Sequence, residues 1–192
     1  MTAKILVFSG SARTGSHNKQ LASAAAHALQ SAKASVTLID LADFPMPIYN
    51  ADLEEKEGVP SKVRELKALF MAHHALLISS PENNASVTSL LKNTLDWVSR
   101  PDAQHDVRLP YRNKVAALVA ASPGALGGLR GLVHLRAILQ TLGVLVLPEQ
   151  FALARAHEAF AKDGALLDAK HQATLGGIAR RLVEVSTRLG VG

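Results

Sequence analysis

The sequence contains no cysteine. This absence excludes disulfide bonds, thiolate nucleophiles and sulfur-ligated metals, so redox chemistry would need a borrowed cofactor. Aromatic residues make up only 4% of the chain, which leaves little surface for stacking on nucleic-acid bases. There is no run of about 18 apolar residues, so no membrane-spanning segment is predicted. The first apolar strand begins within a few residues of Met1, which leaves no room for a signal peptide and predicts a cytoplasmic protein.

Charges of both signs are present, with 21 Lys and Arg residues against 16 Asp and Glu residues. The net charge of +5 is scattered rather than gathered in a basic run, so nucleic-acid binding is not predicted. A mildly basic surface suits small anionic molecules. The adjacent residues His73 and His74 cannot both point at one metal ion, and no H-E-x-x-H spacing occurs. No metal site is therefore predicted.

Short apolar runs alternate with helical patterns along the 192 residues. No repeat or linker interrupts them, which predicts one domain over residues 1–192. Continuous apolar strands separated by helices indicate an α/β fold, a doubly wound five-stranded parallel sheet with helices on both faces. Ligands of such folds bind beyond the carboxyl ends of the strands. Strands are predicted at 4–8, 36–39, 75–79, 115–119 and 144–147, a proline-containing loop at 44–49, and helices after the first strand and at 60–72, 86–100, 129–142 and 167–189.

The turn after the first strand, residues 10–18 (the first loop), is the most informative stretch. A small-residue turn between a strand and a helix directs backbone N–H groups and the positive helix end toward an anion. Ser11, Ser16 and Asn18 add short donors. Arg13 adds a fixed positive charge. The lysine of nucleotide-triphosphate loops and the three spaced glycines of dinucleotide loops are missing. The loop therefore suits a terminal monophosphate; the alternative is an ordinary strand-to-helix turn capped by Ser16.

Two further loops are predicted at the same sheet edge. These are residues 80–86 (the second loop) and 122–128 (the third loop), and both consist of small, polar, turn-forming residues. Because parallel strands end at one edge, all three loops should surround one site. Their backbone N–H groups and Asn84 are suited to the edge of a flat heterocycle, and glycines allow close approach. The alternative is that the glycines of the third loop only serve the tight start of the following helix.

At these loops the sequence resembles the NADPH-dependent FMN reductases of the flavodoxin-like superfamily, the group with chromate, quinone and azo-dye reductases. The resemblance covers most of residues 4–150, and its segments occur in the expected order. The matching segments are Gly10-Ser11-x-Arg13-x-x-Ser16-x-Asn18-x-x-Leu21, Pro81-Glu82-x-Asn84, Leu91-Lys92-Asn93-x-Leu95-Asp96-Trp97, and Ser122-Pro123-Gly124-x-Leu126-Gly127-Gly128-Leu129-Arg130 with His134-Leu135-Arg136.

The resemblance implies strand order 2-1-3-4-5, bound FMN, and hydride transfer from NADPH or NADH through the flavin to a flavin, quinone, azo or chromate-type acceptor. It also implies a homodimer or homotetramer, with the helix after the second loop at the subunit contact. Hydride transfer needs no general acid or base, so no catalytic side chain is predicted. The implied contacts are Ser11, Arg13, Ser16 and Asn18 to the FMN phosphate, and Pro81, Glu82, Asn83, Asn84, Ser122, Pro123, Gly124 and Gly127 around the ring.

Three positions depart from the family pattern. Asn83 stands where an aromatic residue, mostly Tyr, is usual, Ala85 where Gly is frequent, and His17 where an aromatic residue is frequent. Asparagine lacks the apolar contact area of tyrosine, so FMN affinity, the nicotinamide pocket or the oligomer is expected to differ.

Two other function classes remain open from the sequence. A flavodoxin-type electron carrier would bind FMN without a pyridine-nucleotide site, but such carriers are typically acidic, and the net charge here is +5. A non-catalytic flavin-binding regulatory module would bind FMN without turnover.

Overall fold

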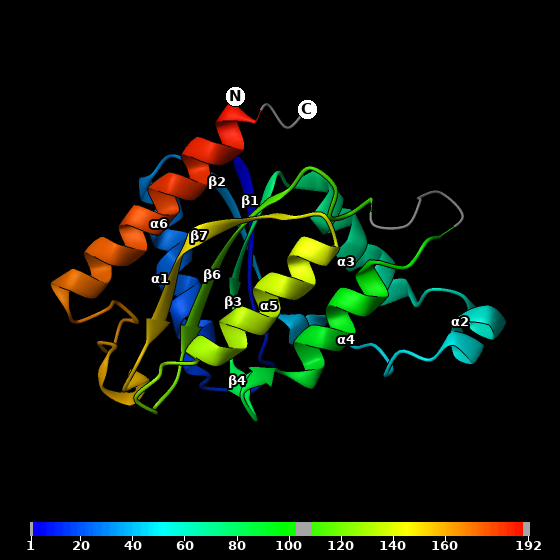
Figure 1. The fold of residues 1–192 in the computed structure, drawn as a ribbon, viewed down its shortest axis with the longest axis horizontal. Coiled ribbons are helices and arrows are strands. Elements are labelled where there is room, and N and C mark those ends of the chain that lie inside the picture. Colours follow the sequence, from blue (N-terminus) through cyan, green and yellow to red (C-terminus); the bar gives the residue numbers. More distant parts are fainter. Residues whose placement is uncertain (1, 103–108, 190–192) are drawn as a thin grey trace.

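The computed structural model describes residues 2–102 and 109–189 (Figure 1). Residue 1, the segment 103–108 and residues 190–192 of the predicted domain lie outside the described residues. The main sheet of the protein is parallel and has the order β2-β1-β3-β6-β7. This confirms the predicted doubly wound sheet and its 2-1-3-4-5 order. The strands are β1 (Lys4–Ser9), β2 (Ser35–Ile39), β3 (Ala75–Ser79), β6 (Val115–Ala121) and β7 (Leu145–Leu153).

Helices cover both faces of the sheet. In Figure 1, α1 and α6 lie on one face, and α3, α4 and α5 lie on the other. The larger helices are α1 (His17–Ser31), α3 (Ser61–Ala72), α4 (Ser89–Val98), α5 (Leu129–Thr141) and α6 (Ala169–Arg188), and the short ones are α2 (Ala51–Glu57), η1 (Leu41–Asp43) and η2 (Ala156–Glu158). None of the described helices is long and apolar enough to cross a bilayer.

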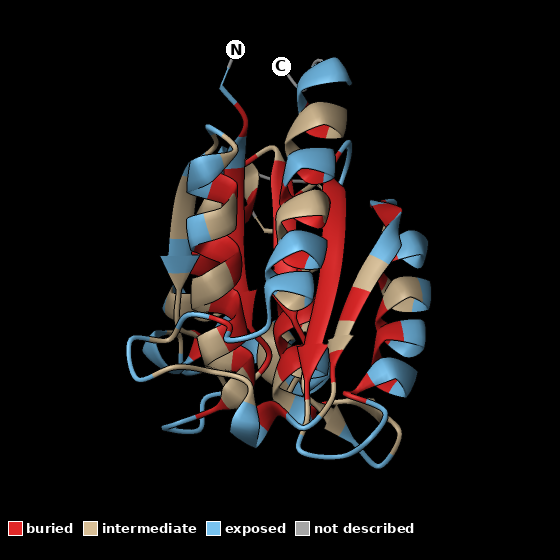
Figure 2. Cartoon of the chain, turned by 90° about the vertical axis from the view of Figure 1, so that its left-hand side faces the viewer, coloured by how far each residue is buried: buried red, intermediate tan, exposed pale blue. Residues whose placement is uncertain are grey.

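Alternation along the strands divides the apolar core between the two faces. In β1, Ile5 and Val7 pack toward α1 and α6, whereas Leu6 and Phe8 pack toward α3, α4 and α5. All seven residues of β6 are buried, and Figure 2 shows the buried strands enclosed by helices with exposed outer faces. Burial on both faces explains why the strands are continuous apolar runs rather than alternating ones.

Two segments differ from the prediction. The second loop contains an antiparallel hairpin, β4 (Glu82–Asn83) and β5 (Ser86–Val87), so α4 begins at Ser89 rather than at 86. The last strand extends well beyond the predicted end at 147, past Pro148. A register shift between Ala116 and Leu118 accommodates that proline, and β7 is an edge strand, where proline is tolerated.

Candidate functional site

The three predicted loops surround one cavity of about 490 Å³ beyond the carboxyl ends of β1, β3 and β6. This is where a doubly wound sheet binds its ligands, and the volume lies in the range of small-molecule sites. Gly124, Gly127 and Asn84 are predicted site residues that do not line this cavity. The lining consists of Gly10, Ser11, Ala12, Arg13, Ser16, His17, Asn18, Pro81, Glu82, Asn83, Thr88, Ser89, Leu90, Ala121, Ser122 and Pro123.

The first loop and the start of α1 present donors that have few partners among the described residues. Ser16 occupies the N-cap position of α1, but its side chain makes no capping hydrogen bond, and the first turn contains no acidic residue. The first N–H groups of a helix have no partner within the helix, so the positive end of α1 is open to an anion. Nearby, the Ser11 hydroxyl accepts from the Arg13 N–H at 3.3 Å, and the exposed Arg13 guanidinium donates to the Gly15 carbonyl at 3.2 Å.

Asn18 lines the cavity, but its side-chain amide is held by the scaffold. Nδ2 donates to the Ala121 carbonyl at 2.7 Å, and Oδ1 accepts from the Ala121 N–H and the Ser79 hydroxyl, both at 3.0 Å. Asn18 is 4% exposed. These bonds fasten the first turn of α1 to the ends of β6 and β3, so the residue sets where the open helix end points.

Glu82 joins the second loop to the helix after the third loop. Its carboxylate accepts from Arg130 Nε at 2.8 Å and from the Gly131 N–H at 3.0 Å. Burial acts to raise the pKa of Glu82, but the bonds from Arg130 and Gly131 outweigh it and hold that pKa below its usual value. The carboxylate is thus ionised and attached to the N-terminal turn of α5 rather than free in the cavity.

The hairpin turn explains one departure from the family pattern. Asn84 and Ala85 have φ of 49° and 63°, the left-handed pair of a type I′ turn, for which Asn-Gly is the favoured sequence. Ala85 therefore occupies a position that suits glycine. The turn carries Asn84 away from the cavity lining, whereas Asn83, one residue earlier on β4, lines it.

Thr88 is a site residue that the sequence reasoning missed. Its hydroxyl donates to the Gly10 carbonyl at 2.7 Å and accepts from the Leu91 N–H at 3.1 Å, which makes it the N-cap of α4. The signal was present, because a threonine directly precedes the apolar periodicity of that helix. Thr88 thereby links the first loop to the second.

The third loop contributes residues to the cavity lining and packs closely against β7. Ser122 and Pro123 line the cavity, and the Ser122 hydroxyl accepts from the Gly124 N–H at 3.2 Å. Gly127 has φ of 62°, and a Cβ there would lie 2.6 Å from the backbone carbon of Ala152 in β7. Packing of the loop against the sheet therefore requires glycine at this position.

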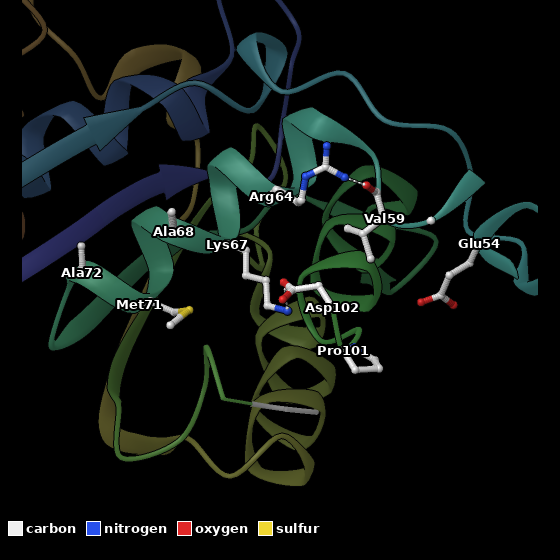
Figure 3. A pocket seen from close by; sticks show the side chains of 10 residues that line it. Glu54, Val59, Arg64, Lys67, Ala68, Met71, Ala72, Pro101 and Asp102 are labelled. Carbon is white, nitrogen blue, oxygen red and sulfur yellow. Dashed lines mark hydrogen bonds and ion pairs between the residues drawn. The ribbon is translucent and has the colours of Figure 1, made fainter. Parts of the chain in front are cut away.

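A larger cavity, of about 1010 Å³, lies beside α3. Figure 3 shows Lys67 and Asp102 pointing toward each other inside it, and Arg64 turned to the Val59 carbonyl. Glu54, at its rim, accepts from Arg100 at 2.9 Å. These charged groups already bind one another or the backbone. Despite its size, the cavity therefore leaves few charged groups available to a ligand. Among the described residues there is no group of three His, Cys, Asp or Glu side chains that could hold a metal ion.

The sheet order and the cavity beyond its carboxyl edge define a flavodoxin-like α/β protein. A flavodoxin from the domain Archaea shares the fold, with a TM-score of 0.62 at 11% identity over 96% of this chain and 99% of that chain. A more similar structure is the flavoenzyme NAD(P)H:(acceptor) oxidoreductase of Paracoccus denitrificans, with a TM-score of 0.81 at 28% identity over 99% of this chain and 100% of that chain.

Sequence comparison gives the family. The model of the NADPH-dependent FMN reductases matches residues 3–158. An NAD(P)H-dependent FMN reductase of Pseudomonas aeruginosa is 38% identical over 172 residues, which cover 87% of this chain and 86% of the relative. The quinone reductase of Escherichia coli is 33% identical over 144 residues, which cover 75% of this chain and 73% of the relative. The chain belongs to the NADPH-dependent FMN reductase family, as its loop motifs predicted.

Proposed function

We propose that this protein is an FMN-dependent NAD(P)H oxidoreductase that passes a hydride from NADPH or NADH through FMN to a flavin, quinone, azo or chromate-type acceptor. The observation that carries the proposal is the open N-terminus of α1, which faces a cavity walled by the other two loops. Family membership and the names of the relatives support it. Bound FMN would supply the hydride chemistry, and the chain would bind and orient it.

The donor set of the first loop fits a monophosphate. Two hydroxyls, from Ser11 and Ser16, a guanidinium from Arg13 and the unpaired N–H groups of α1 suit a dianion. No carboxylate of the first turn opposes it. Asn18 contributes by fixing the position of this helix end, since its amide already bonds the ends of β6 and β3.

The remaining loops fit a flat ring beside that phosphate. Pro81 and Pro123 contribute apolar side chains to the cavity lining from two different loops, and Asn83 and Ser122 contribute polar ones. Glu82 holds the two loops together through Arg130. We propose that Asn84 and Gly124 contact the ring from the rim and that Gly127 supports the third loop from behind. Asn83 offers less apolar contact than tyrosine, so part of the ring face remains accessible to an acceptor.

We also propose a cytoplasmic homodimer or homotetramer in which residues 1–192 form a single domain. Leu129 and Val133 on α5 are 40% and 57% exposed, close to Glu82 and the second loop, whose Ser86 bonds His134 of the same helix. Apolar side chains at this place would be covered by a second copy. Sedimentation velocity with and without FMN tests the oligomer.

The function is tested by titrating the purified protein with FMN and then adding NADPH or NADH without oxygen. Saturable FMN binding followed by bleaching of the flavin absorbance, with turnover on adding a quinone, is the expected result. An electron carrier would bind FMN but stay yellow with NADPH alone. A protein that neither binds FMN nor consumes NADPH would refute the proposal.

A further inference from the structure

Lys19 makes two contacts that the catalytic proposal does not use. From the first turns of α1, its Nζ donates to Asp40 Oδ2 at 2.5 Å and to the Ala12 carbonyl at 3.2 Å. Asp40 follows β2, whereas Ala12 lies in the middle of the first loop. One ammonium group therefore connects the anion-binding loop to a neighbouring strand end.

Asp40 is itself held in place. Its Oδ1 accepts from the Ala42 N–H at 3.0 Å, so the carboxylate caps the short helix η1. Partial burial acts to raise the pKa of Asp40, but the bonds from Lys19 and Ala42 outweigh it and leave this pKa below its usual value. The Asp40 carboxylate is therefore ionised at neutral pH and presents a fixed point for the lysine.

The first loop has few other anchors near Ala12. Among the described residues, the remaining hydrogen bonds of residues 11–15 are short-range, from Arg13 to Ser11 and to Gly15. Lys19 and Asp40 also border a cavity of about 350 Å³, so the ion pair is open on that side. Within the part of the chain that the structure describes, the hydrogen bond that ties Ala12 to another element is the one from Lys19.

We infer that the Lys19–Asp40 pair is a positioning device for the anion-binding loop. By fixing the Ala12 carbonyl, it holds the following N–H groups and the Arg13 side chain in place for a phosphate. Lys19 and Asp40 touch no ligand in this role. The inference rests on the proposed function, since the ligand in question is FMN.

A pair of variants separates positioning from simple charge attraction. If Lys19 only attracts the phosphate by its charge, Asp40→Asn removes a nearby negative charge and strengthens FMN binding. If the pair positions the loop, Asp40→Asn weakens FMN binding as Lys19→Met does, because the lysine loses its fixed point. The two readings thus predict opposite signs for the same substitution.

The experiment measures the dissociation constants of FMN and riboflavin by fluorescence quenching in the full-length protein. We expect Lys19→Met and Asp40→Asn each to weaken FMN binding by roughly two- to five-fold, the scale of a partly exposed ion pair. Riboflavin, which lacks the phosphate, should be affected less than two-fold, on the order of such a pair's lower limit. Lys62→Met is the matched control, because it removes an exposed lysine paired with Glu65 on α3.

Hydrogen–deuterium exchange of the ligand-free protein gives a second readout that does not need FMN. Peptides covering residues 10–16 should exchange faster in Lys19→Met and Asp40→Asn than in the native protein or Lys62→Met. Tighter FMN binding by Asp40→Asn, equal losses of FMN and riboflavin, or unchanged exchange would each overturn the inference. Failure of the native protein to bind FMN would refute the proposed function instead. The exchange experiment would still test the positioning role of the Lys19–Asp40 pair, because it does not need FMN.

Discussion

Helix ends at the two edges of the sheet differ in how their backbone groups are hydrogen-bonded. At the amino edge, two buried lysines satisfy backbone carbonyls: Lys67 donates to the Arg100 carbonyl just after α4, and Lys114 donates to the His73 carbonyl just after α3, both bonds within 2.7 Å. At the carboxyl edge, Thr88 caps α4, but α1 has neither a side-chain cap nor an acidic first turn.

The difference shows where this molecule can accept a ligand. Carbonyls at helix C-termini carry partial negative charge, and after α3 and α4 the protein binds such carbonyls with its own lysines. The N–H groups at the start of α1 carry partial positive charge, and the described chain leaves them for an external anion. Volume alone would have pointed to the cavity of about 1010 Å³ beside Lys67, where the charges are already paired.

The largest expected effect comes from removing the anion-binding groups of the carboxyl edge. Arg13→Glu combined with Ser11→Ala and Ser16→Ala should weaken FMN binding by roughly 100- to 1000-fold, because a charged partner and two hydroxyl donors are lost. Isothermal titration with FMN measures it. Arg112→Glu makes the same charge change at the exposed amino edge and should have little effect. Unchanged FMN retention in the triple variant would remove the basis of the assigned site.

Breaking the buried ion pair of the amino edge should affect stability instead of binding. Lys67 and Asp102 approach to 2.7 Å, and their side chains are 2% and 12% exposed. Asp102→Asn leaves a buried ammonium without its countercharge and should lower the free energy of unfolding by about 3 kcal/mol. Urea denaturation measures this. Asp96→Asn breaks the exposed pair with Lys92 and should cost less than about 1 kcal/mol. A large loss of FMN affinity in Asp102→Asn would show that the edges are coupled.

Lys114 makes the amino edge sensitive to alkaline pH. Burial lowers the pKa of Lys114 to about 8. The folded state therefore holds this proton less tightly than the unfolded chain, so the charged lysine opposes folding below pH about 8. That penalty, about 3 kcal/mol, disappears as the pH rises from about 8 toward about 10.5. Lys114→Met also leaves the His73 carbonyl without this donor, so the expected signature is the pH dependence: the native protein should gain stability relative to Lys114→Met between pH 7 and pH 10.

Denaturation of both proteins at the two pH values measures the effect, with Lys62→Met as the control for an exposed lysine. A stability difference that does not change with pH would show that the Lys114 amine is not desolvated as its burial indicates.

The smallest expected effect concerns the hairpin at the cavity rim. Ala85 has φ of 63°, and glycine adopts this conformation without the steric cost of a Cβ. Ala85→Gly should raise the free energy of unfolding by about 0.5–1 kcal/mol. Ala161→Gly, at a residue without positive φ, should lower it slightly. Destabilisation by Ala85→Gly would mean that the Ala85 methyl group contributes packing that outweighs the strain.

The sequence predicted much of the fold, but it did not predict which residues of the site hold the loops together and which are open to a ligand. The convergence of the three loops was predicted from apolar periodicity and loop composition, which are local, whereas the strand order was implied by the family resemblance. Asn18 and Glu82 were predicted to contact the cofactor, and in the structure their polar atoms hold loops together. The partner of Asn18 is 103 residues away, and no local pattern indicates such a bond. The contacts predicted for FMN itself stay predictions.

The sequence by itself determined the alternation of strands and helices and the small polar loops after β1, β3 and β6, since these depend on spacing within a dozen residues. Only the tertiary structure decided which polar groups face the cavity and which already form hydrogen bonds within the protein. Thr88 reaches Gly10 across 78 positions and Lys19 reaches Asp40 across 21. Such partners are set by the register between distant segments, because a hydrogen bond requires its two atoms to meet within about 3 Å.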